Sequence, residues 1–409
     1  MMKKIFNDVI VLVGKELEPF LCSVLEIEDG FIKKIDKKKA VKANEGKRLL
    51  IMPGLWNSHT HIADSAFPDG AIGLTLEQGF FRPDGFKYRM LRDVDKKLLL
   101  ESIVQHQIYM AQCGTVGHID FREQGVLGSR LLKEASMKSG IRAISLGQFS
   151  EAPFSEKELY ENVAILKDST LLELQDLLDI ADGFSESTIN DLTDPAWIEI
   201  RKQTDLKNKI RAIHCLENEN YRDTSFRISG IGDLERALKI FDPHLIVHMT
   251  VANDEEIELA RKSKASFVLN PRANASLGLP LPPISKLLDS GINLLLGTDN
   301  GMLNSPNIFA ELDFTYRTCK SQYRDVMQPD PVAILKMATS NISNFFDKKH
   351  YGYLEEGLPA DFTVIDFSKP HLLNSKHIIA SIVTRVTPND VVETFVQGRP
   401  LLGRCEDKS

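Results

Sequence analysis

The stretch Leu49-Leu50-Ile51-Met52-Pro53-Gly54-Leu55-Trp56-Asn57-Ser58-His59-Thr60-His61 joins an apolar run to two histidines that are one residue apart. A short apolar run of this kind is typical of a buried strand. Successive side chains of a strand point to opposite faces, so His59 and His61 point to the same face and can reach one point in space. A divalent metal ion requires this of its first two ligands.

The composition is that of a globular protein with a sizeable core. The chain has 409 residues, of which 43% are hydrophobic and 26% charged, and its formal net charge is -7. This length suits one large barrel plus a smaller module. The lysines within residues 33–39 are interrupted by Asp36 and follow an expected hairpin, so we interpret them as a solvated turn. Without a concentrated positive arm, nucleic acid is not an expected partner.

The cysteines are scattered and show no Cys-x-x-Cys spacing, which favours buried thiols in a reducing compartment over a disulfide frame. They are Cys22, Cys113, Cys215, Cys319 and Cys405. The first residues lack the apolar segment and cleavage site of a secretory signal, and no apolar run approaches the length of a membrane span. We therefore expect a cytoplasmic protein with no membrane partner.

Apolar runs alternate with amphipathic segments after residue 50. Eight runs are expected to be strands, at 50–56, 115–120, 141–146, 180–184, 210–216, 245–248, 266–269 and 292–296. The segments expected to be helices lie at 93–112, 128–139, 171–178, 234–240, 254–263, 284–290, 306–319 and 331–346. Eight strands that alternate with helices predict an α/β fold of the (β/α)8 TIM barrel type.

Both ends of the chain have β character. Short strands are expected at 9–13, 23–27 and 31–32, and again at 362–367, 381–383 and 391–396. The simplest organisation joins residues 1–50 and 348–409 into one small, discontinuous β-sandwich domain. The barrel, residues 51–347, is then inserted between its two halves.

Candidate functional residues stand at the ends of expected strands. His59 and His61 follow the first strand, His214 closes the fifth and His248 the sixth, and Asp299 follows the eighth. In such barrels chemistry gathers at the carboxyl ends of the strands. One histidine at a strand end is usually structural, but this many on suitable strands indicate a metal site.

The chain resembles the amidohydrolase superfamily over essentially its whole length. The resemblance is carried by the motifs at residues 53–61, His214-Cys215-Leu216-Glu217, His248 and Gly297-Thr298-Asp299-Asn300. The turn at residues 357–364 is also similar to the one by which this family re-enters its β domain.

The resemblance implies a single metal ion. Family members with two metals carry a bridging lysine at the end of strand four, whereas residues 181–187 contain none. The His-x-x-Glu motif is similar to the cytosine, guanine and S-adenosylhomocysteine deaminase branch. Carried over by position, the metal ligands are His59, His61, His214 and Asp299. Glu217 would move protons, and His248 would polarise the attacking water or hold the tetrahedral intermediate. Dimers are common among similar proteins, so a homodimer is compatible with the resemblance.

The chemistry of these residue types agrees with the assignment. Three neutral imidazoles and one carboxylate suit Zn²⁺ as first choice, or Fe²⁺, with a position left for water. The metal lowers the pKa of that water from about 15.7 towards 7. Deamination then requires protonation of a ring nitrogen and departure of ammonia, and a carboxyl group that alternates between acid and base can serve both steps. We assign this role to Glu217, while Asp299 can accept the proton of the water.

Other polar residues are weaker candidates. Ser185 and Glu186 face the expected mouth of the barrel, and Arg272 or Asn274 could contact substrate or serve structural roles after strand seven. The aromatic loop at 80–86 could cover a flat ring or pack on the barrel. We expect His118, inside the second strand, to be a buried structural residue.

These observations predict a metal-dependent aminohydrolase, an enzyme that deaminates a purine- or pyrimidine-type heterocycle as the base or the nucleoside. One alternative is hydrolysis of a cyclic amide, an imidazolone or a halogenated ring on the same metal. Another, of a different class, is a binding or scaffold protein that has kept the fold without catalysis. The complete set of ligands and acid argues against the scaffold.

Overall fold

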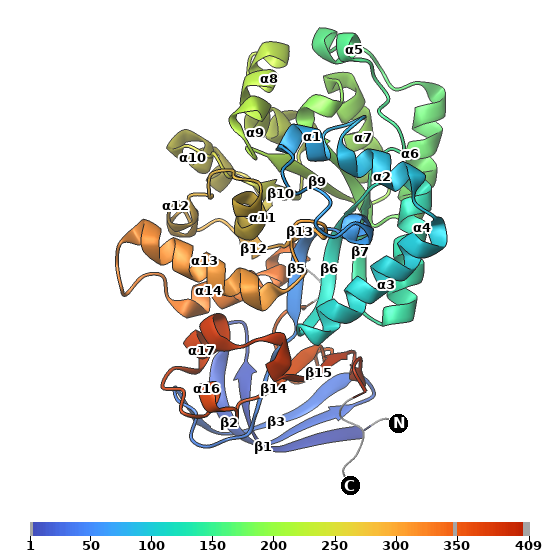
Figure 1. Ribbon diagram of the computed structural model, residues 1–409. Coiled ribbons are helices and arrows are strands. Elements are labelled where there is room, and N and C mark those ends of the chain that lie inside the picture. The colour runs from blue at the N-terminus through green and yellow to red at the C-terminus, as the bar shows by residue number, and fades with distance from the viewer. Residues whose placement is uncertain (1–2, 347–349, 404–409) are drawn as a thin grey trace.

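The computed structural model describes residues 3–346 and 350–403 and contains two β-sheets, one above the other in Figure 1. The larger is a parallel sheet surrounded by helices, and the smaller is built from both ends of the chain. A TIM-barrel domain with a small β domain is therefore confirmed. The division at 50/51 and 347/348 stays a prediction. Residues 347–349 and Cys405 lie outside the described residues.

The barrel strands follow one another in chain order around the sheet. They are β5 (Leu55–His61), β6 (Thr115–Arg122), β7 (Arg142–Gly147), β8 (Gly183–Thr188), β9 (Ile210–Cys215), β10 (Leu245–His248), β11 (Ser266–Leu269), β12 (Leu294–Leu296) and β13 (Asp299–Asn300). Strand eight is represented by β12 and β13, which Gly297 and Thr298 separate. Because β12 pairs with β11 and β13 pairs with β5, this interrupted strand joins the first and last parts of the sheet.

Helices connect the strands and cover the outside of the barrel (Figure 1). The connecting helices are α3 (Lys96–Gln112), α4 (Gly125–Ser139), α6 (Asp168–Ile180), α7 (Asp194–Leu206), α9 (Asp233–Arg236), α10 (Asp254–Lys262), α12 (Ile284–Asp289) and α13 (Ile308–Tyr323). Further helices lie in the segments after β5, β7, β9 and β11, namely α1 (Leu76–Phe80), α2 (Phe86–Asp93), α5 (Glu156–Glu161), α8 (Glu219–Ser229) and α11 (Pro271–Ser276).

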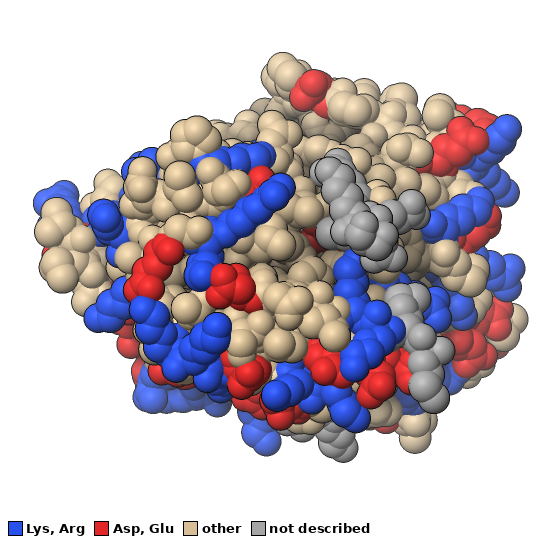
Figure 2. Space-filling model, turned by 90° about the horizontal axis from the view of Figure 1, so that it is seen from below, with Lys and Arg blue, Asp and Glu red and all other residues tan. Residues whose placement is uncertain are grey.

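The small sheet has seven strands in the order β16-β15-β14-β4-β1-β2-β3. From the first part of the chain come β1 (Lys3–Val13), β2 (Glu18–Glu28), β3 (Phe31–Ala40) and β4 (Leu49–Pro53), and from the last part β14 (Phe362–Asp366), β15 (Val391–Val396) and β16 (Arg399–Pro400). Seen from below, the end of the molecule at which the small sheet lies, basic and acidic side chains are interspersed (Figure 2).

The opening apolar run supplies a strand to each sheet, whereas one strand at 50–56 was expected. Strand β4 ends at Pro53, which lies opposite Phe362 in the small sheet. Strand β5 begins at Leu55, whose N–H donates to the carbonyl of Gly114 in the barrel. A side chain at Gly54 would lie 2.1 Å from Val116, so the chain passes between the sheets at a residue that has none.

Two other expectations were wrong. Residues 381–383 lie in helix α17 (Ile378–Arg385), not in a strand, because Ile378 and Ile382 belong to a buried face with helical spacing. This helix packs on α13 and α14 (Pro331–Met337). The lysines of residues 33–39 are exposed, as expected, but they belong to strand β3 at the edge of the small sheet and not to a turn.

Other chain-wide expectations can be compared directly with the structure. The four cysteines within the described residues are buried free thiols. Among residues 3–346 and 350–403, no helix is both long and apolar enough to cross a bilayer.

Gly117 on β6 lies against a buried indole inside the barrel. A Cβ added there would lie 2.7 Å from Cη2 of Trp56, whose indole is fully buried against Phe346 and Tyr351. We expect Gly117→Ala to reduce the free energy of unfolding by about 1–3 kcal/mol, because the indole must move within a packed core. Urea denaturation followed by fluorescence measures this change.

Gly79→Ala is the matched control, because a Cβ at this position in helix α1 meets no atom closer than 3.9 Å. It should leave stability unchanged or slightly raised, since alanine favours helix. Equal effects of the two substitutions would contradict the packing assigned to Gly117.

Candidate metal centre and active site

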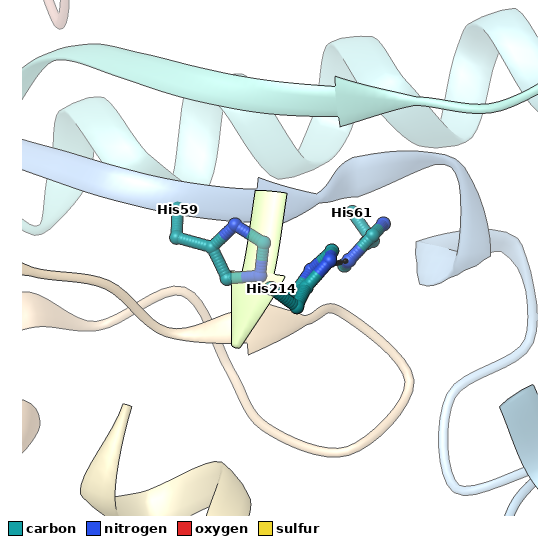
Figure 3. Close-up of side chains that lie close together, drawn as sticks. All are labelled: His59, His61 and His214. Carbon is teal, nitrogen blue, oxygen red and sulfur yellow. Dashed lines mark hydrogen bonds between the residues drawn. The ribbon is translucent and has the colours of Figure 1, made fainter. Parts of the chain in front are cut away.

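The proposed metal ligands come together at the carboxyl ends of the barrel strands. His59 and His61 extend from β5 towards His214 of β9 (Figure 3). Asp299 begins β13, which pairs with β5. All four side chains are almost completely buried. The alternation of a strand and the closure of the barrel thus bring together residues that are up to 240 positions apart.

The ligand atoms of these residues face one another. Nε2 of His61 lies 3.3 Å from Nε2 of His214 and 3.8 Å from Oδ1 of Asp299. The same Oδ1 is 3.2 Å from Nε2 of His59. His248 also comes within reach, because it forms a possible ligand group with His59 and Asp299.

In His61 and His214, the hydrogen bond made by Nδ1 determines whether Nε2 is free to bind a metal ion. Nδ1 of His214 donates to the carbonyl of Ser187 at 2.8 Å, and Nδ1 of His61 donates to the carboxylate of Glu123 at 2.7 Å. In a neutral ring Nε2 then carries the lone pair, and the two Nε2 atoms approach to 3.3 Å. Burial lowers the pKa of His214 and so favours its neutral form, whereas the pKa of His61 is raised because the Glu123 carboxylate outweighs burial.

The donor set fits a divalent cation. Two lone pairs that face each other in a buried site repel unless a cation lies between them. Burial lowers the pKa of His59 to about 3, so this ring is neutral, and its Nε2 lies 3.2 Å from Oδ1 of Asp299. Burial alone would raise the pKa of Asp299, but the nearby His59 and His248 hold it well below its usual range. Three imidazoles and one carboxylate are a donor set that fits a divalent metal ion.

Glu217 lies beside this centre, just after β9. Leu216 adopts a left-handed conformation (φ 54°), and its N–H donates to Asp233, so the chain turns sharply before Glu217. Oε1 of Glu217 is 3.5 Å from Nε2 of His248, and Oε2 accepts a hydrogen bond of 3.0 Å from the Tyr221 hydroxyl. Burial raises the pKa of Glu217, which favours its protonated form.

Two residues of the site have strained backbones. His248 has a φ of 85° and Asp299 a φ of 64°, a region that side-chain-bearing residues rarely occupy. Strain of this kind persists only where the surrounding structure enforces it, and it is concentrated at functional sites.

A small cavity of about 30 Å³ adjoins the cluster. Its wall includes Leu76 and Phe80 of helix α1 and Lys87 of helix α2. The remaining lining residues are His61, Ser187, His214, Glu217, Tyr221, His248, Asp299 and Asn300. The aromatic loop at 80–86 was expected either to cover a flat ring or to pack on the barrel. Phe80 lines the cavity, and Phe81 packs against Tyr221.

The weaker substrate candidates lie elsewhere in the described structure. The Ser185 hydroxyl donates to the carbonyl of Leu146, and Arg272 pairs with Glu311. The Asn274 amide is fully buried without a hydrogen-bond partner among the described residues. Within that part of the chain, the cavity lining does not include these three side chains.

His118 is a buried structural residue, as expected. Its Nδ1 contacts the Thr60 hydroxyl at 3.0 Å, and its Nε2 lies 3.1 Å from the Gln107 amide.

Sequence reasoning missed three residues of the site. Tyr221 follows Glu217 by four positions, and that spacing could have suggested a contact. Glu123 comes directly after β6, a position where site residues are common. Lys87 gives no such signal, because a lysine in a charged helical segment normally faces water.

The barrel and its ligand cluster define a metal-dependent hydrolase, and comparison with known proteins specifies the family. The sequence profile of the Amidohydrolase family matches residues 50–401. The "Putative aminohydrolase" of Methanothermobacter thermautotrophicus is 33% identical over 396 residues, which cover 95% of this chain and 96% of that protein. The chain belongs to the amidohydrolase family.

Named deaminases are among the similar proteins. The 5-methylthioadenosine/S-adenosylhomocysteine deaminase of Caldanaerobacter subterraneus is 28% identical over 386 residues, which cover 89% of this chain and 84% of that protein. The crystal structure of an adenosine deaminase from Xanthomonas campestris with bound zinc has the same fold, with a TM-score of 0.81 at 18% identity. That match covers 96% of this chain and 92% of the other.

Removal of a ligand should abolish metal binding. We expect purified protein reconstituted with Zn²⁺ to retain about one ion per chain, as the missing bridging lysine implies, and His61→Ala or His214→Ala to retain almost none. Each substitution removes one of the two facing nitrogens. Elemental analysis after gel filtration measures the metal content.

His244→Ala provides the control, because His244 accepts a hydrogen bond from the Arg211 N–H before β10 begins, away from the strand ends that carry the cluster. It should bind metal as the unmodified protein does. Full metal content in His214→Ala would show that the cluster is not the binding site.

Proposed function

We propose that this protein is a hydrolytic deaminase of a purine- or pyrimidine-type nitrogen heterocycle, taken as the base or the nucleoside. The observation that carries the proposal is the buried Glu217 carboxyl, which lies beside the metal ligands and 3.5 Å from His248. The names of similar proteins, such as 5-methylthioadenosine/S-adenosylhomocysteine deaminase, support the same reaction.

In this proposal His59, His61, His214 and Asp299 hold the ion, with Zn²⁺ preferred over Fe²⁺. The ion supplies Lewis acidity and lowers the pKa of a bound water. Asp299 would accept a proton from that water, and it begins as a carboxylate because His59 and His248 hold its pKa well below the usual range. His248, held in a strained conformation beside Glu217, polarises the water or hydrogen-bonds to the oxygen of the tetrahedral intermediate.

Glu217 moves the other protons. Its raised pKa keeps a proton available for the ring nitrogen next to the carbon that is attacked. The carboxylate that results can take a proton from the hydroxyl group of the tetrahedral intermediate and pass it to the amino group, which then leaves as ammonia. The proton taken by Asp299 can then restore the Glu217 acid. The Tyr221 hydroxyl holds one oxygen of Glu217 and so fixes the direction of the carboxyl group.

Other parts of the proposal depend on the sequence and the chemistry of the site. Contact of Ser185, Arg272 and Asn274 with substrate stays a prediction. For Ser185 and Arg272, however, the bonds to the Leu146 carbonyl and to Glu311 favour structural roles. We also propose that the protein works in the cytoplasm on small heterocycles and not on nucleic acid. A homodimer is compatible with the resemblance to its family.

Substitution of the acid tests the mechanism. We expect Glu217→Gln to lower kcat/KM by about 10²- to 10⁴-fold, because an amide cannot give up a proton to the ring. The assay measures ammonia released by zinc-loaded protein from a panel of aminated bases and nucleosides, to which cyclic amides and halogenated rings are added. Product analysis also detects the alternatives, since a cyclic amide would give a ring-opened acid and a halogenated ring would give halide.

Glu219→Gln is the control, because Glu219 lies two residues further on with an exposed side chain and pairs with Arg222. It should keep full activity. Undiminished turnover by Glu217→Gln would refute the assigned mechanism. Metal-loaded protein that releases none of the three kinds of product from the panel would favour the scaffold alternative.

The pH dependence follows from the direction of the Glu217 shift. Because burial raises its pKa, the proton donor persists to higher pH than in an exposed glutamate and is lost as pH rises through that pKa. The Tyr221 hydroxyl donates to the carboxylate and opposes the shift. We therefore expect Tyr221→Phe to move the alkaline limb of the kcat/KM profile to higher pH.

Tyr323→Phe removes a comparable contact elsewhere, since Tyr323 donates to Asp289 at 2.6 Å between helices α13 and α12. It should leave the alkaline limb unmoved. A shift of the limb to lower pH in Tyr221→Phe would contradict the assignment of that limb to Glu217.

A further inference from the structure

Lys87 is a buried cation whose amino group lies close to a metal ligand. It belongs to helix α2, where Lys87 and Leu91 form the buried face. Only 4% of its side chain is exposed, although lysine is among the residues least often buried. Its Nζ lies 2.9 Å from Oε1 of Glu123 and 3.5 Å from Nδ1 of His61.

Glu123 connects this lysine to the metal site. Its Oε1 accepts hydrogen bonds both from Nδ1 of His61, at 2.7 Å, and from Nζ of Lys87. Its Oε2 accepts from the Arg122 guanidinium at 3.3 Å. The Glu123 side chain is 1% exposed, so protein groups replace water around its charge. A buried carboxylate that loses one of its cations is strongly destabilised.

The direction of the His61 ring depends on this carboxylate. Donation from Nδ1 to Glu123 leaves the lone pair on Nε2, the atom that faces Nε2 of His214. Loss of the hydrogen-bond partner of a metal-binding histidine typically lowers metal affinity by about 10- to 100-fold. Because Lys87 and His61 share the same oxygen of Glu123, loss of the lysine would allow that oxygen to move away from the ring.

The same lysine connects the metal site to the segment beside the cavity. Helix α2 follows α1, and Leu76, Phe80 and Lys87 of these two helices line the cavity. Nζ of Lys87 is 5.7 Å from the centre of the Phe80 ring and 5.3 Å from that of Tyr88. The contact with Glu123 therefore joins a wall of the cavity to a metal ligand.

We propose that Lys87 is a positioning residue that acts through Glu123 to hold His61 in its metal-binding orientation and thereby couples helix α2 to the bound ion. The coupling is reciprocal, because a contact that favours the bound ion is itself favoured when the ion is present. It concerns how the ion is held, so it does not depend on which reaction the protein catalyses.

The test is a double-mutant cycle with Zn²⁺ affinity as the readout, measured by competition with a chromophoric chelator. Lys87→Met should weaken Zn²⁺ binding by about 10- to 100-fold. In a Glu123→Gln background the same lysine substitution should have little further effect, because the group through which it acts has changed. Unchanged affinity in Lys87→Met, or an equal loss in both backgrounds, would overturn the proposal.

Hydrogen exchange of helix α2 provides a second readout. Zn²⁺ should slow exchange of residues 86–93 in the unmodified protein and should lose most of this effect in Lys87→Met. Equal protection by Zn²⁺ in both proteins would contradict the coupling. The control is Lys369→Met, which removes a lysine 3.1 Å from the buried Asp390 near the small sheet. It should change neither Zn²⁺ affinity nor the protection of helix α2.

If Lys87→Met does not fold, as judged by circular dichroism, Glu123→Gln alone decides the proposal. This variant keeps an oxygen that can accept from His61 but removes the charge that holds Lys87. It should lower Zn²⁺ affinity and weaken the metal-dependent protection of helix α2. Unmodified behaviour in both measurements would overturn the proposal, whether or not the protein proves to be a deaminase.

Discussion

The close approach of two imidazole Nε2 atoms is the constraint on which the rest of the site depends. His61 and His214 each use Nδ1 as a donor, and their Nε2 atoms face each other at 3.3 Å, so that each ring presents a lone pair when it is neutral. Such an arrangement is unfavourable in a buried site unless a cation is bound there. The arrangement therefore lowers the stability of the metal-free fold, and the strained backbones of His248 and Asp299 act in the same direction.

The direction of the barrel strands brings these side chains together. Parallel strands bring their carboxyl ends to one rim, so residues from β5, β9, β10 and β13 meet without any long loop. The side chains are fixed by strands, by the backbone carbonyl of Ser187 and by the carboxylate of Glu123. Glu217 differs, because it stands on a turn after β9, where a carboxyl group can change its protonation state while the ligands stay in place.

The sequence predicted most of the features that follow from strand periodicity. Local sequence pattern was enough to predict the strands at 245–248 and 266–269, and the structure has both at those positions. It was also enough to predict that His59 and His61 point to the same face. The run at 381–383 was too short to distinguish a strand from one turn of the buried face of a helix. The break at Pro53-Gly54 was overlooked because both strands that it separates are apolar.

The contacts that sequence reasoning missed depend on how loops fold over the barrel. Lys87 reaches Glu123 only because helix α2 lies beside the mouth, and no periodicity within residues 86–93 reports that. The Tyr221 contact with Glu217 was accessible in principle from the spacing of four residues, but the turn at Leu216 determines whether the two side chains meet.

The small sheet has a further consequence at its two edges. One edge is β3, with five exposed lysines, and the other is the two-residue strand β16, which ends in Pro400. Closely spaced positive charges and proline both prevent a strand of another molecule from adding to a sheet. The backbone groups at these edges are thereby protected from the edge-to-edge pairing that begins aggregation. We therefore expect copies of this protein that associate to do so through side-chain surfaces and not by extending the small sheet.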